Sequence, residues 1–231
     1  MTTLLNQTVL VTGANRGMGR HYVTQLLDRG VAKVYAAARD AGQIDTTDPR
    51  VVALTLDVTD AQSVAAAAEA APDVSVLINN AGIVRGASVL GRDTSGLRDE
   101  LETNLFGPLA MASTFADQIV AKRGAIVNVA SVLAWLPVGA SYGVSKAAMW
   151  SATDSMRLEL APRGVQVVGA YVGLVDTDMA SFSDSPKSDP ADVVRQILDG
   201  IEAGAAEVLA DEMTRHVRAE LNKPILERTP G

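Results

Sequence analysis

Residues 8–19, TVLVTGANRGMG, contain the stretch that decides the fold. The run TVLV is apolar and rich in β-branched side chains, which predicts a strand over residues 8–11, buried on both faces of a parallel sheet. A glycine-rich turn follows, and the next apolar residues recur with the period of a helix that ends near Gly30. A strand, a turn and a helix in this order predict the first unit of an alternating β/α fold.

Three glycines lie between this strand and this helix, at Gly13, Gly17 and Gly19. Glycine lets the backbone turn tightly, and it lets a phosphate approach the N–H groups at a helix N-terminus. The G-x-x-x-G-x-G spacing differs from the general G-x-G-x-x-G fingerprint, so a simple tight turn is the alternative. The position directly behind the first strand favours a nucleotide-binding loop.

Strands and helices continue to alternate outward from this first unit. We expect the further strands over residues 33–38, 51–56, 74–78, 125–129, 165–171 and 207–210. The alternation predicts an α/β fold, a doubly wound parallel sheet of about seven strands with helices on both faces (a Rossmann fold). No linker or change in composition divides the chain, so we expect residues 1–231 to form a single dinucleotide-binding and catalytic domain.

Local signals predict where several helices begin and end. Residues 59–62, TDAQ, match a capping box at the start of a helix. A long helical region over residues 95–122 is expected to be interrupted near residues 107–108, Gly-Pro. Asp-Pro at residues 189–190 predicts an N-cap followed by proline at the first helical position. We expect the tail, residues 223–231, to be irregular.

Composition and charge exclude several classes of function. The net charge of −7 argues against a nucleic-acid or anionic-membrane partner. The chain has no cysteine and only two distant histidines, so we expect no disulfide and no metal site. The N-terminus lacks the pattern of a signal peptide, and no apolar run reaches the roughly 20 residues that span a bilayer. We therefore expect a cytoplasmic protein.

Residues 131–146, SVLAWLPVGASYGVSK, hold a serine, a tyrosine and a lysine. Tyr142 and Lys146 are four residues apart, so on a helix they share one face, about 5–6 Å apart at their Cβ atoms. A nearby ammonium lowers the pKa of a tyrosine from about 10, which predicts general acid–base chemistry at Tyr142. The spacing alone is common, and Ser131 has a plainer alternative as a turn residue after a strand.

Two arginines predict which dinucleotide binds. Arg39 follows the second strand, where an acidic residue binds the ribose of NAD and an arginine accommodates the 2′-phosphate of NADP. Asp40 comes one residue later, and Arg16 lies in the glycine loop. Two guanidinium groups near one phosphate favour NADP(H). The alternative is that either arginine is only a solvated surface charge.

Five motifs in order make the sequence resemble a known family. They are Thr12-Gly-x-x-x-Gly-x-Gly19, Asn79-Asn-Ala-Gly82, Asn104, Ser131 and Tyr142-x-x-x-Lys146. Each motif is weak alone, but the ordered set resembles the short-chain dehydrogenase/reductase family in its simple single-domain form. The resemblance extends over about residues 8–209.

The resemblance implies roles for individual residues. The catalytic residues it implies are Asn104, Ser131, Tyr142 and Lys146, with Asn104 supporting a proton-relay water or stabilising a helix kink. The cofactor-binding residues it implies are Gly13, Asn15, Arg16, Gly17, Met18, Gly19, Arg39, Asp57, Val58, Asn80, Ala81, Gly82, Tyr142, Lys146, Val175 and Thr177. Valine at position 172 replaces a family proline, which leaves the stiffness of that turn open, and the step from Ser131 to Tyr142 is slightly short.

The function these observations predict is an NADP(H)-dependent oxidoreductase that interconverts a ketone or aldehyde and an alcohol. Apolar residues flank the predicted site, so the small-molecule substrate is expected to be apolar, although several of them could belong to the core: Val84, Leu133, Trp135, Leu136, Val138, Met179 and Phe182. Alternative functions are a non-catalytic NADP(H)-sensing regulator and a reductase of 3-oxoacyl groups bound to acyl carrier protein.

The helix after Tyr142 is expected to contribute to self-association. Four apolar residues, Met149, Trp150, Met156 and Leu160, are spread around its predicted exterior, more than one face of a sheet needs. In the family that the sequence resembles, such helices pair between subunits. We therefore expect a homodimer or a homotetramer.

Overall fold

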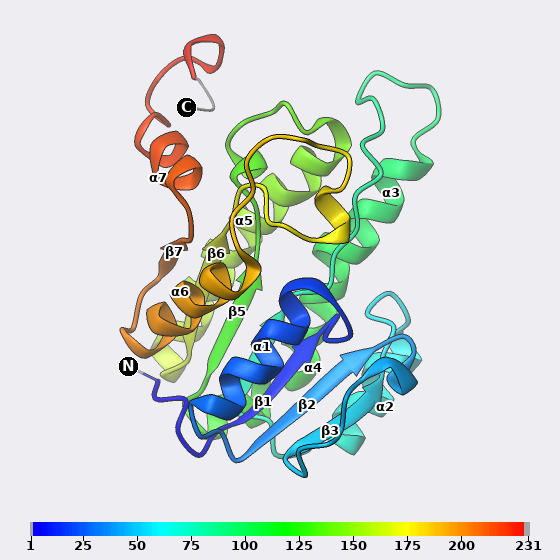
Figure 1. Ribbon diagram of the computed structural model, residues 1–231, viewed down its shortest axis with the longest axis vertical. Helices are drawn as coiled ribbons and strands as arrows, with labels where there is room; N and C mark the ends of the chain where they lie inside the picture. Colours follow the sequence, from blue (N-terminus) through cyan, green and yellow to red (C-terminus); the bar gives the residue numbers. More distant parts are fainter. Residues whose placement is uncertain (1, 229–231) are drawn as a thin grey trace.

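A seven-stranded parallel sheet forms the centre of the computed structural model, which describes residues 2–228 (Figure 1). The strand order is β3-β2-β1-β4-β5-β6-β7, and each neighbouring pair is parallel. The strands are β1 (Thr8–Thr12), β2 (Lys33–Ala38), β3 (Val51–Thr55), β4 (Val76–Asn79), β5 (Ala125–Val129), β6 (Gln166–Tyr171) and β7 (Glu207–Leu209). The predicted doubly wound Rossmann fold is confirmed.

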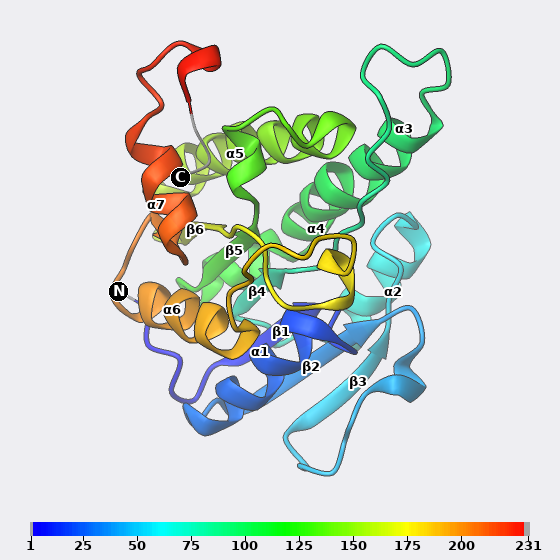
Figure 2. The same ribbon diagram turned by 45° about the horizontal axis from the view of Figure 1, so that its top comes forward.

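Helices cover both faces of this sheet (Figure 2). On one face lie α1 (Gly17–Asp28) and α6 (Pro190–Glu202), and on the other lie α2 (Ala61–Ala70), α4 (Gly107–Ala121) and α5 (Ala140–Leu160). The shorter α3 (Ser95–Leu101) precedes α4, and α7 (Glu212–Ala219) follows β7.

Strand β1 shows why its sequence is apolar throughout. Val9 and Val11 pack into the core under α1 and α6, whereas Leu10 between them packs into the core under α4 and α5. All three side chains are fully buried. Because successive side chains of a strand point to opposite faces, a strand with helices on both sides has no position for a polar residue.

The strand order reverses between β1 and β4, and this reversal fixes the place of the site. Strands β2 and β3 lie on one side of β1, and β4 to β7 lie on the other. The loops that leave β1 and β4 therefore diverge and open a crevice at the carboxyl ends of the strands. Ligands of doubly wound sheets bind in this crevice.

One predicted helix boundary is wrong by one residue, and two are confirmed. The N-cap of α2 is Asp60, whose side chain accepts from the Gln62 N–H at 3.0 Å, whereas the predicted capping box placed the N-cap at Thr59. The long helix is interrupted by a π turn (Glu102–Phe106) that ends directly before the Gly-Pro pair, as expected. The helical backbone continues into α4, so the missing N–H of Pro108 leaves a carbonyl of the preceding turn without its intrahelical donor. Asp189 caps α6, accepting from the Ala191 N–H at 2.7 Å.

The expected apolar exterior of α5 is also wrong. Met149 and Met156 are buried in this chain's own core, at 1% and 8% exposed. Trp150 is half-buried and packs edge-to-face on Trp135 with 5.9 Å between ring centres. Besides the sheet, α5 packs against α3 and against residues 132–134. The homo-oligomer stays a prediction.

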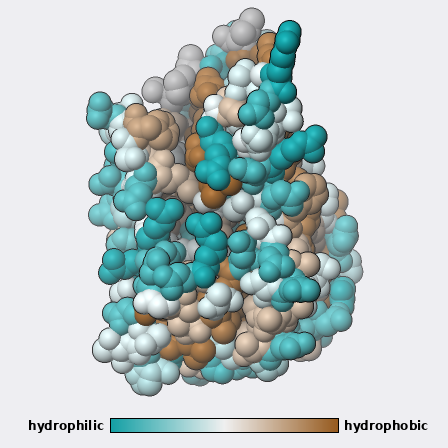
Figure 3. Space-filling view, turned by 90° about the vertical axis from the view of Figure 1, so that its right-hand side faces the viewer, coloured by the Kyte–Doolittle hydropathy of each residue, from teal (hydrophilic) through white to brown (hydrophobic). Residues whose placement is uncertain are grey.

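The surface on the side of α2 and α3 mixes the two kinds of side chain, with hydrophobic groups between hydrophilic ones (Figure 3). Within residues 2–228, no helix is both long and apolar enough to cross a bilayer. The same part of the chain contains no cluster of three or more His, Asp or Glu side chains that could hold a metal ion.

Candidate active site

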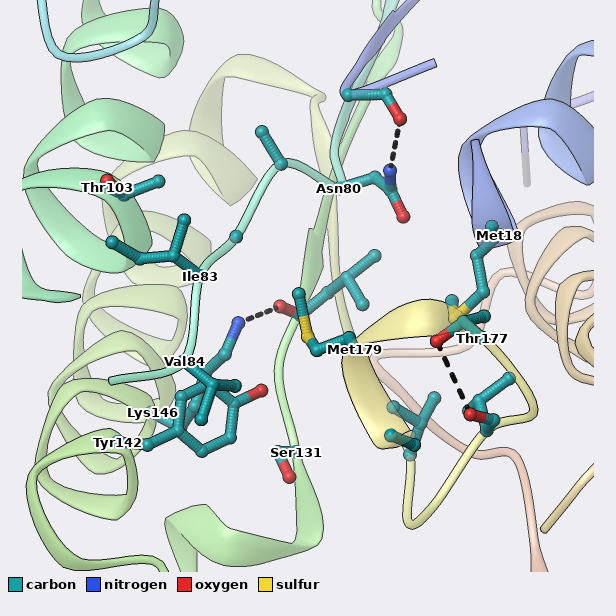
Figure 4. A pocket seen from close by; sticks show the side chains of 18 of the residues that line it. Met18, Asn80, Ile83, Val84, Thr103, Ser131, Tyr142, Lys146, Thr177 and Met179 are labelled. Carbon is teal, nitrogen blue, oxygen red and sulfur yellow. Dashed lines mark hydrogen bonds between the residues drawn. The ribbon is translucent and has the colours of Figure 1, made fainter. Parts of the chain in front are cut away.

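A cleft of about 1620 Å³ lies at the carboxyl ends of strands β1 to β6. Its lining includes every predicted site residue except two, Gly19 and Asn104, which lie behind the surface. Figure 4 shows Ser131, Tyr142 and Lys146 grouped on one side, with Met18 and Thr177 opposite them. Pockets for drug-sized ligands are about 300–1,000 Å³, so this cleft is large enough for a dinucleotide and a small substrate together.

The loop between β1 and α1 requires its glycines. Gly13 and Gly17 have φ values of +65° and +49°, in the left-handed region that side chains disfavour. A Cβ atom on Gly19 would lie 2.0 Å from the carbonyl oxygen of Gly13, so the helix can start this close to the strand only without a side chain. The glycine spacing therefore marks a backbone cradle, beyond a simple tight turn.

The N-terminus of α1 is open toward the cleft. Its N-cap residue, Arg16, has extended backbone and makes no side-chain cap. Helices α2, α6 and α7 are different, because each begins with a capping aspartate: Asp60, Asp189 and Asp211. The first N–H groups of a helix have no intrahelical acceptor. At α1 they remain available to an anion such as a phosphate.

The carboxylate and the arginines after β2 have different surroundings. Asp40 caps the 3-10 turn that follows it, accepting from the Gly42 N–H and from the side chain of Gln43, both at 3.0 Å. Arg39 is exposed and lines the cleft. Arg16 also lines it and pairs across the opening with Asp178 at 3.3 Å, both side chains being largely exposed. The acidic group is thus engaged by its own loop, whereas the guanidinium groups face the cleft opening.

The remaining residues on this side are held by their neighbours. The Asn15 side chain donates to Gln43 at 2.7 Å. Asp57 accepts from the N–H and the hydroxyl of Thr59 at 3.0 and 2.7 Å, and the backbone bond is the main reason that its pKa lies below the usual range. Val58 is buried and packs against Gly107, the first residue of α4. Side chains fixed in this way give the adenine side of a dinucleotide site a preformed shape.

The turn after β4 supports the glycine loop. The Asn80 side chain donates to the carbonyl of Thr12 at 2.9 Å (Figure 4). In return, the Thr12 hydroxyl accepts from the N–H groups of Asn80 and Ala81, both at 3.0 Å. The glycine motif in the sequence includes Thr12, but it predicted no role for this residue. Its place at the carboxyl end of β1, opposite the end of β4, is the signal that could have identified it as a brace.

Tyr142 and Lys146 share one face of α5, as predicted. The Lys146 ammonium nitrogen lies 5.6 Å from the centre of the Tyr142 ring. It donates to the carbonyl of Val129 at 2.9 Å, at the end of β5 (Figure 4). Ser131 lies two residues further along, buried, with its hydroxyl accepting from the Leu133 N–H at 3.2 Å. Ser131 is therefore a turn cap, and it also lines the cleft.

The electrostatics of this pair differ from the prediction. Burial lowers the pKa of Lys146 to about 8. Burial also raises the pKa of Tyr142 well above its usual range, while the Ser131 hydroxyl acts to lower it and the Glu100 carboxylate to raise it. The expected low tyrosine pKa is therefore wrong for this chain. Burial has the largest effect on the pKa of Tyr142, and Lys146, whose ammonium donates to the Val129 carbonyl, is not among the groups that lower it.

Asn104 lies in the π turn and connects three segments. Its side chain pairs with both backbone groups of Ile83, each at 2.9 Å. It also donates to the Ser145 hydroxyl at 3.0 Å, and Ser145 donates to the carbonyl of Tyr142 at 2.8 Å. Asn104 therefore links the π turn to residue 83 and to α5. The two roles that the resemblance implies, stabilising a helix kink and supporting a proton-relay water, stay predictions.

The turn after β6 is held without a proline. The carbonyl of Val172 accepts from the Val132 N–H at 2.9 Å, and the Gly173 N–H donates to Asp211 at 2.5 Å. These bonds fix on both sides the turn whose stiffness the sequence left open. Val175 and Thr177 follow it and line the cleft.

Six of the seven predicted substrate-facing residues line the cleft: Val84, Leu133, Leu136, Val138, Met179 and Phe182. Trp135 is the exception. It is 3% exposed and packs on Tyr171 with 4.3 Å between ring centres. The 3-10 turn (Val132–Ala134) places it in a separate apolar cluster beneath α7, so it is a core residue.

Comparison with known proteins identifies the family. The family model for short chain dehydrogenases matches residues 7–188. The chain therefore belongs to the short chain dehydrogenase family, as its ordered motifs predicted.

Individual relatives agree with this assignment. A solved short chain dehydrogenase from Burkholderia cenocepacia J2315, in complex with NADP, is similar with a TM-score of 0.91 and 38% identity, covering 96% of this chain and 95% of that one. The NADPH-dependent 1-acyldihydroxyacetone phosphate reductase of Schizosaccharomyces pombe is 33% identical over 75% of this chain and 61% of the relative. The 3-oxoacyl-acyl-carrier-protein reductase of Escherichia coli K12 is 30% identical over 86% of this chain and 85% of the relative. The chain spans about three-fifths of the length of several fungal relatives.

Proposed function

We propose that the protein is an NADP(H)-dependent oxidoreductase that interconverts a ketone or aldehyde and an alcohol. One observation carries the proposal: Ser131, Tyr142 and Lys146 meet in the same cleft as an open helix N-terminus and two cleft-facing arginines. A nucleotide-binding loop alone would fit a sensor, but a sensor does not need these three side chains as well.

The residues on the β1 to β3 side fit NADP(H). The pyrophosphate would be held by the N–H groups at the start of α1, and the 2′-phosphate by Arg39 and Arg16. Asp40 already accepts two hydrogen bonds from its own turn, which disfavours a role as the ribose acceptor that NAD requires. The similar solved structure from Burkholderia cenocepacia contains NADP, and the reductase from Schizosaccharomyces pombe is NADPH-dependent; both support this choice. When bound, the nicotinamide ring supplies or accepts the hydride.

The chain's own side chains handle the substrate oxygen and its proton. Ser131 would donate a hydrogen bond to that oxygen and orient it. Tyr142 would donate a proton in the reductive direction and accept one in the oxidative direction. Lys146, fixed by the carbonyl of Val129, would bind the nicotinamide ribose and stabilise the tyrosinate. At neutral pH the phenol of Tyr142 is protonated, as the acid role requires, and its raised pKa makes it a weaker acid than a free tyrosine.

The cleft favours an apolar substrate of modest size. Val138 and Phe182 are 74% and 75% exposed on its rim, and Met179 is 42% exposed. The E. coli relative supports a second candidate, reduction of 3-oxoacyl thioesters carried by acyl carrier protein. A cytoplasmic location and a homodimer or homotetramer complete the proposal; a monomer in light scattering would contradict the oligomer.

The test is a substrate panel with purified protein. Acetophenone, benzaldehyde, ethyl 3-oxobutanoate and a 3-oxobutanoyl thioester are each incubated with NADPH, and absorbance loss is followed. Tyr142→Phe should reduce the rate about 10²–10⁴-fold. The control is Tyr35→Phe, which removes a phenol bonded to Asp73, far from the cleft, and should leave the rate nearly unchanged. Retention of more than about a tenth of the activity by Tyr142→Phe excludes the assigned role.

A further inference from the structure

A buried carboxylate lies one helical turn before Asn104. Glu100 is 0% exposed, and its Oε1 atom accepts from the N–H groups of Arg85 and Gly86 at 2.6 and 3.1 Å. Its Oε2 atom is buried too and has no hydrogen-bond partner within residues 2–228. Burying a carboxylate with an unsatisfied oxygen is unfavourable, so its presence calls for an explanation.

Glu100 and Asn104 hold the same segment. They are four residues apart, so both project from one side of α3 and the π turn. Asn104 pairs with the backbone of Ile83, and Glu100 with the N–H groups two and three residues further on. The connection at residues 83–87 is therefore fixed at two points by neighbouring turns of one helical segment.

The same connection is bonded to α5, the helix that carries Tyr142. The Ser141 N–H donates to the carbonyl of Ala87 at 3.0 Å, and Ser141 directly precedes Tyr142. Val84, within the connection, lines the same cleft as Tyr142 and Lys146 (Figure 4). Glu100 is thus linked through residues 83–87 to the wall around the tyrosine.

Several charged groups lie around Tyr142. The Lys146 ammonium lies on the tyrosine's own helix, with its nitrogen 5.6 Å from the ring centre, and the Glu100 carboxyl group lies on α3. Arg85 and Asp99 line the cleft and form an exposed ion pair at 3.3 Å, and the exposed Glu102 lines the cleft too. Of these three acidic side chains, Glu100 is the buried one.

We propose that Glu100 is a positioning residue for proton transfer at Tyr142, anchoring residues 83–87 and, through them, the start of α5. The inference rests on the proposed function, because it takes Tyr142 to be the group that exchanges the proton. Glu100 acts through the tyrosine and the connection and does not touch the substrate.

The first test compares turnover in Glu100→Ala and Glu100→Gln. The amide keeps an oxygen for both N–H groups, whereas alanine removes both hydrogen bonds. For reduction of acetophenone, or the fastest substrate of the panel, we expect Glu100→Ala to lower kcat at least about tenfold, because the wall beside Tyr142 loses its anchor. The KM for NADPH should stay within about threefold, and Glu100→Gln should retain most of kcat. An unchanged kcat in Glu100→Ala, or equal losses in both variants, overturns the proposal.

The matched control is Asp99→Ala, which removes an exposed carboxylate one residue away. Its kcat should not change. If kcat falls as far as in Glu100→Ala, the effect does not depend on the buried anchor, and the proposal is also overturned.

A second measurement does not depend on activity. In Glu100→Ala both acceptor bonds are lost, and amide hydrogen exchange at Arg85 and Gly86 should become at least about tenfold faster, whereas Glu100→Gln should retain most of the protection. Unchanged exchange in Glu100→Ala overturns the anchoring role. If Tyr142→Phe retains activity, the proposed function fails instead, and the exchange result still decides the anchor.

Discussion

The two ends of the cleft differ in how they use their polar groups. The nucleotide end, residues 12–19, 39–43 and 57–59, presents an uncapped helix N-terminus and the exposed Arg39 to the cleft. The substrate end, residues 83–94, 131–140 and 172–189, bonds much of its backbone internally, as at Ile83 and Val172. Its exposed rim is apolar instead, with Val138 and Phe182.

This difference shows what each end can recognise. Donors without internal partners define where the charged atoms of a ligand will bind, so the nucleotide end specifies its ligand chemically. Apart from the oxygen that Ser131 and Tyr142 would bind, a wall whose backbone groups are already bonded selects by shape and apolar contact. The comparison therefore explains why the cofactor can be inferred more closely than the substrate.

The largest effect is expected when one methyl group is added at the nucleotide end, and the same change at the substrate end serves as the comparison. Gly19→Ala would place Cβ 2.0 Å from a carbonyl oxygen, so the glycine loop must move, and NADPH affinity should fall at least about 100-fold, or about 3 kcal/mol. Gly86→Ala has no atom within 4 Å of the new Cβ and suffers only from its φ of +65°. It should lose about 1 kcal/mol of stability and leave NADPH binding nearly unchanged. Fluorescence titration of NADPH with both variants checks this; equal losses would remove the distinction between the ends.

The next effect concerns the phosphate that distinguishes the two cofactors. Arg39→Ala should weaken NADPH binding about 10–100-fold, the value of one or two charge-assisted hydrogen bonds, and leave NADH binding within about threefold. Titration with each nucleotide measures both constants. The control is Arg20→Ala, an exposed arginine on α1 outside the cleft lining, which should change neither. A parallel loss for NADPH and NADH in Arg39→Ala would mean that Arg39 does not read the 2′-phosphate.

The sequence predicted the nucleotide end because its signals are local. A strand followed at once by Gly13, Gly17 and Gly19 is a pattern of neighbours in the chain, and so are Arg39 and the spacing of Tyr142 and Lys146. The Rossmann order of strands follows from the same alternation.

The substrate end could not be predicted in the same way, because its contacts join distant residues. Glu100 bonds a connection about 15 residues earlier, and only the docking of α3 shows that its oxygen is buried. The position of Trp135 depends on a short 3-10 turn that no sequence pattern predicted. The raised pKa of Tyr142 depends on burial, which only the folded chain shows. Periodicity reports which face is apolar, but not which partner covers it.

Lys146 should show a conflict between stability and function. Its pKa falls from 10.5 to about 8 on burial, which corresponds to about 3 kcal/mol of lost stability near neutral pH. This cost is fully present below about pH 8, where the lysine is charged in both states. It shrinks as pH rises toward 10.5, because the folded protein releases its proton first.

Lys146→Met should therefore abolish turnover and raise the melting temperature at about pH 7 by about 2–6 °C, since the lost bond to the Val129 carbonyl offsets part of the gain. The gain should diminish by about pH 9.5. Thermal unfolding at both pH values tests this, with the exposed Lys122→Met as a control that should not change. A lower melting temperature of Lys146→Met at neutral pH would show that burying the charged lysine does not lower the stability of the folded protein.

The smallest effect tests the backbone at the boundary of the substrate end. At the nucleotide end, glycine occupies the left-handed positions 13 and 17, but Ala140, the first residue of α5, has φ +47° with a side chain. A non-glycine residue in this conformation lowers the stability by about 1–2 kcal/mol. Replacing it with glycine removes this strain, but the greater flexibility of glycine in the unfolded chain offsets about 0.5–1 kcal/mol of the gain. Ala140→Gly should therefore raise the melting temperature by about 1–3 °C. Ala147→Gly, inside the same helix, should lower it, because glycine there costs about 1 kcal/mol. Opposite signs in the two variants would show that the short loop before Tyr142 is closed under backbone strain; two losses would show that it is not.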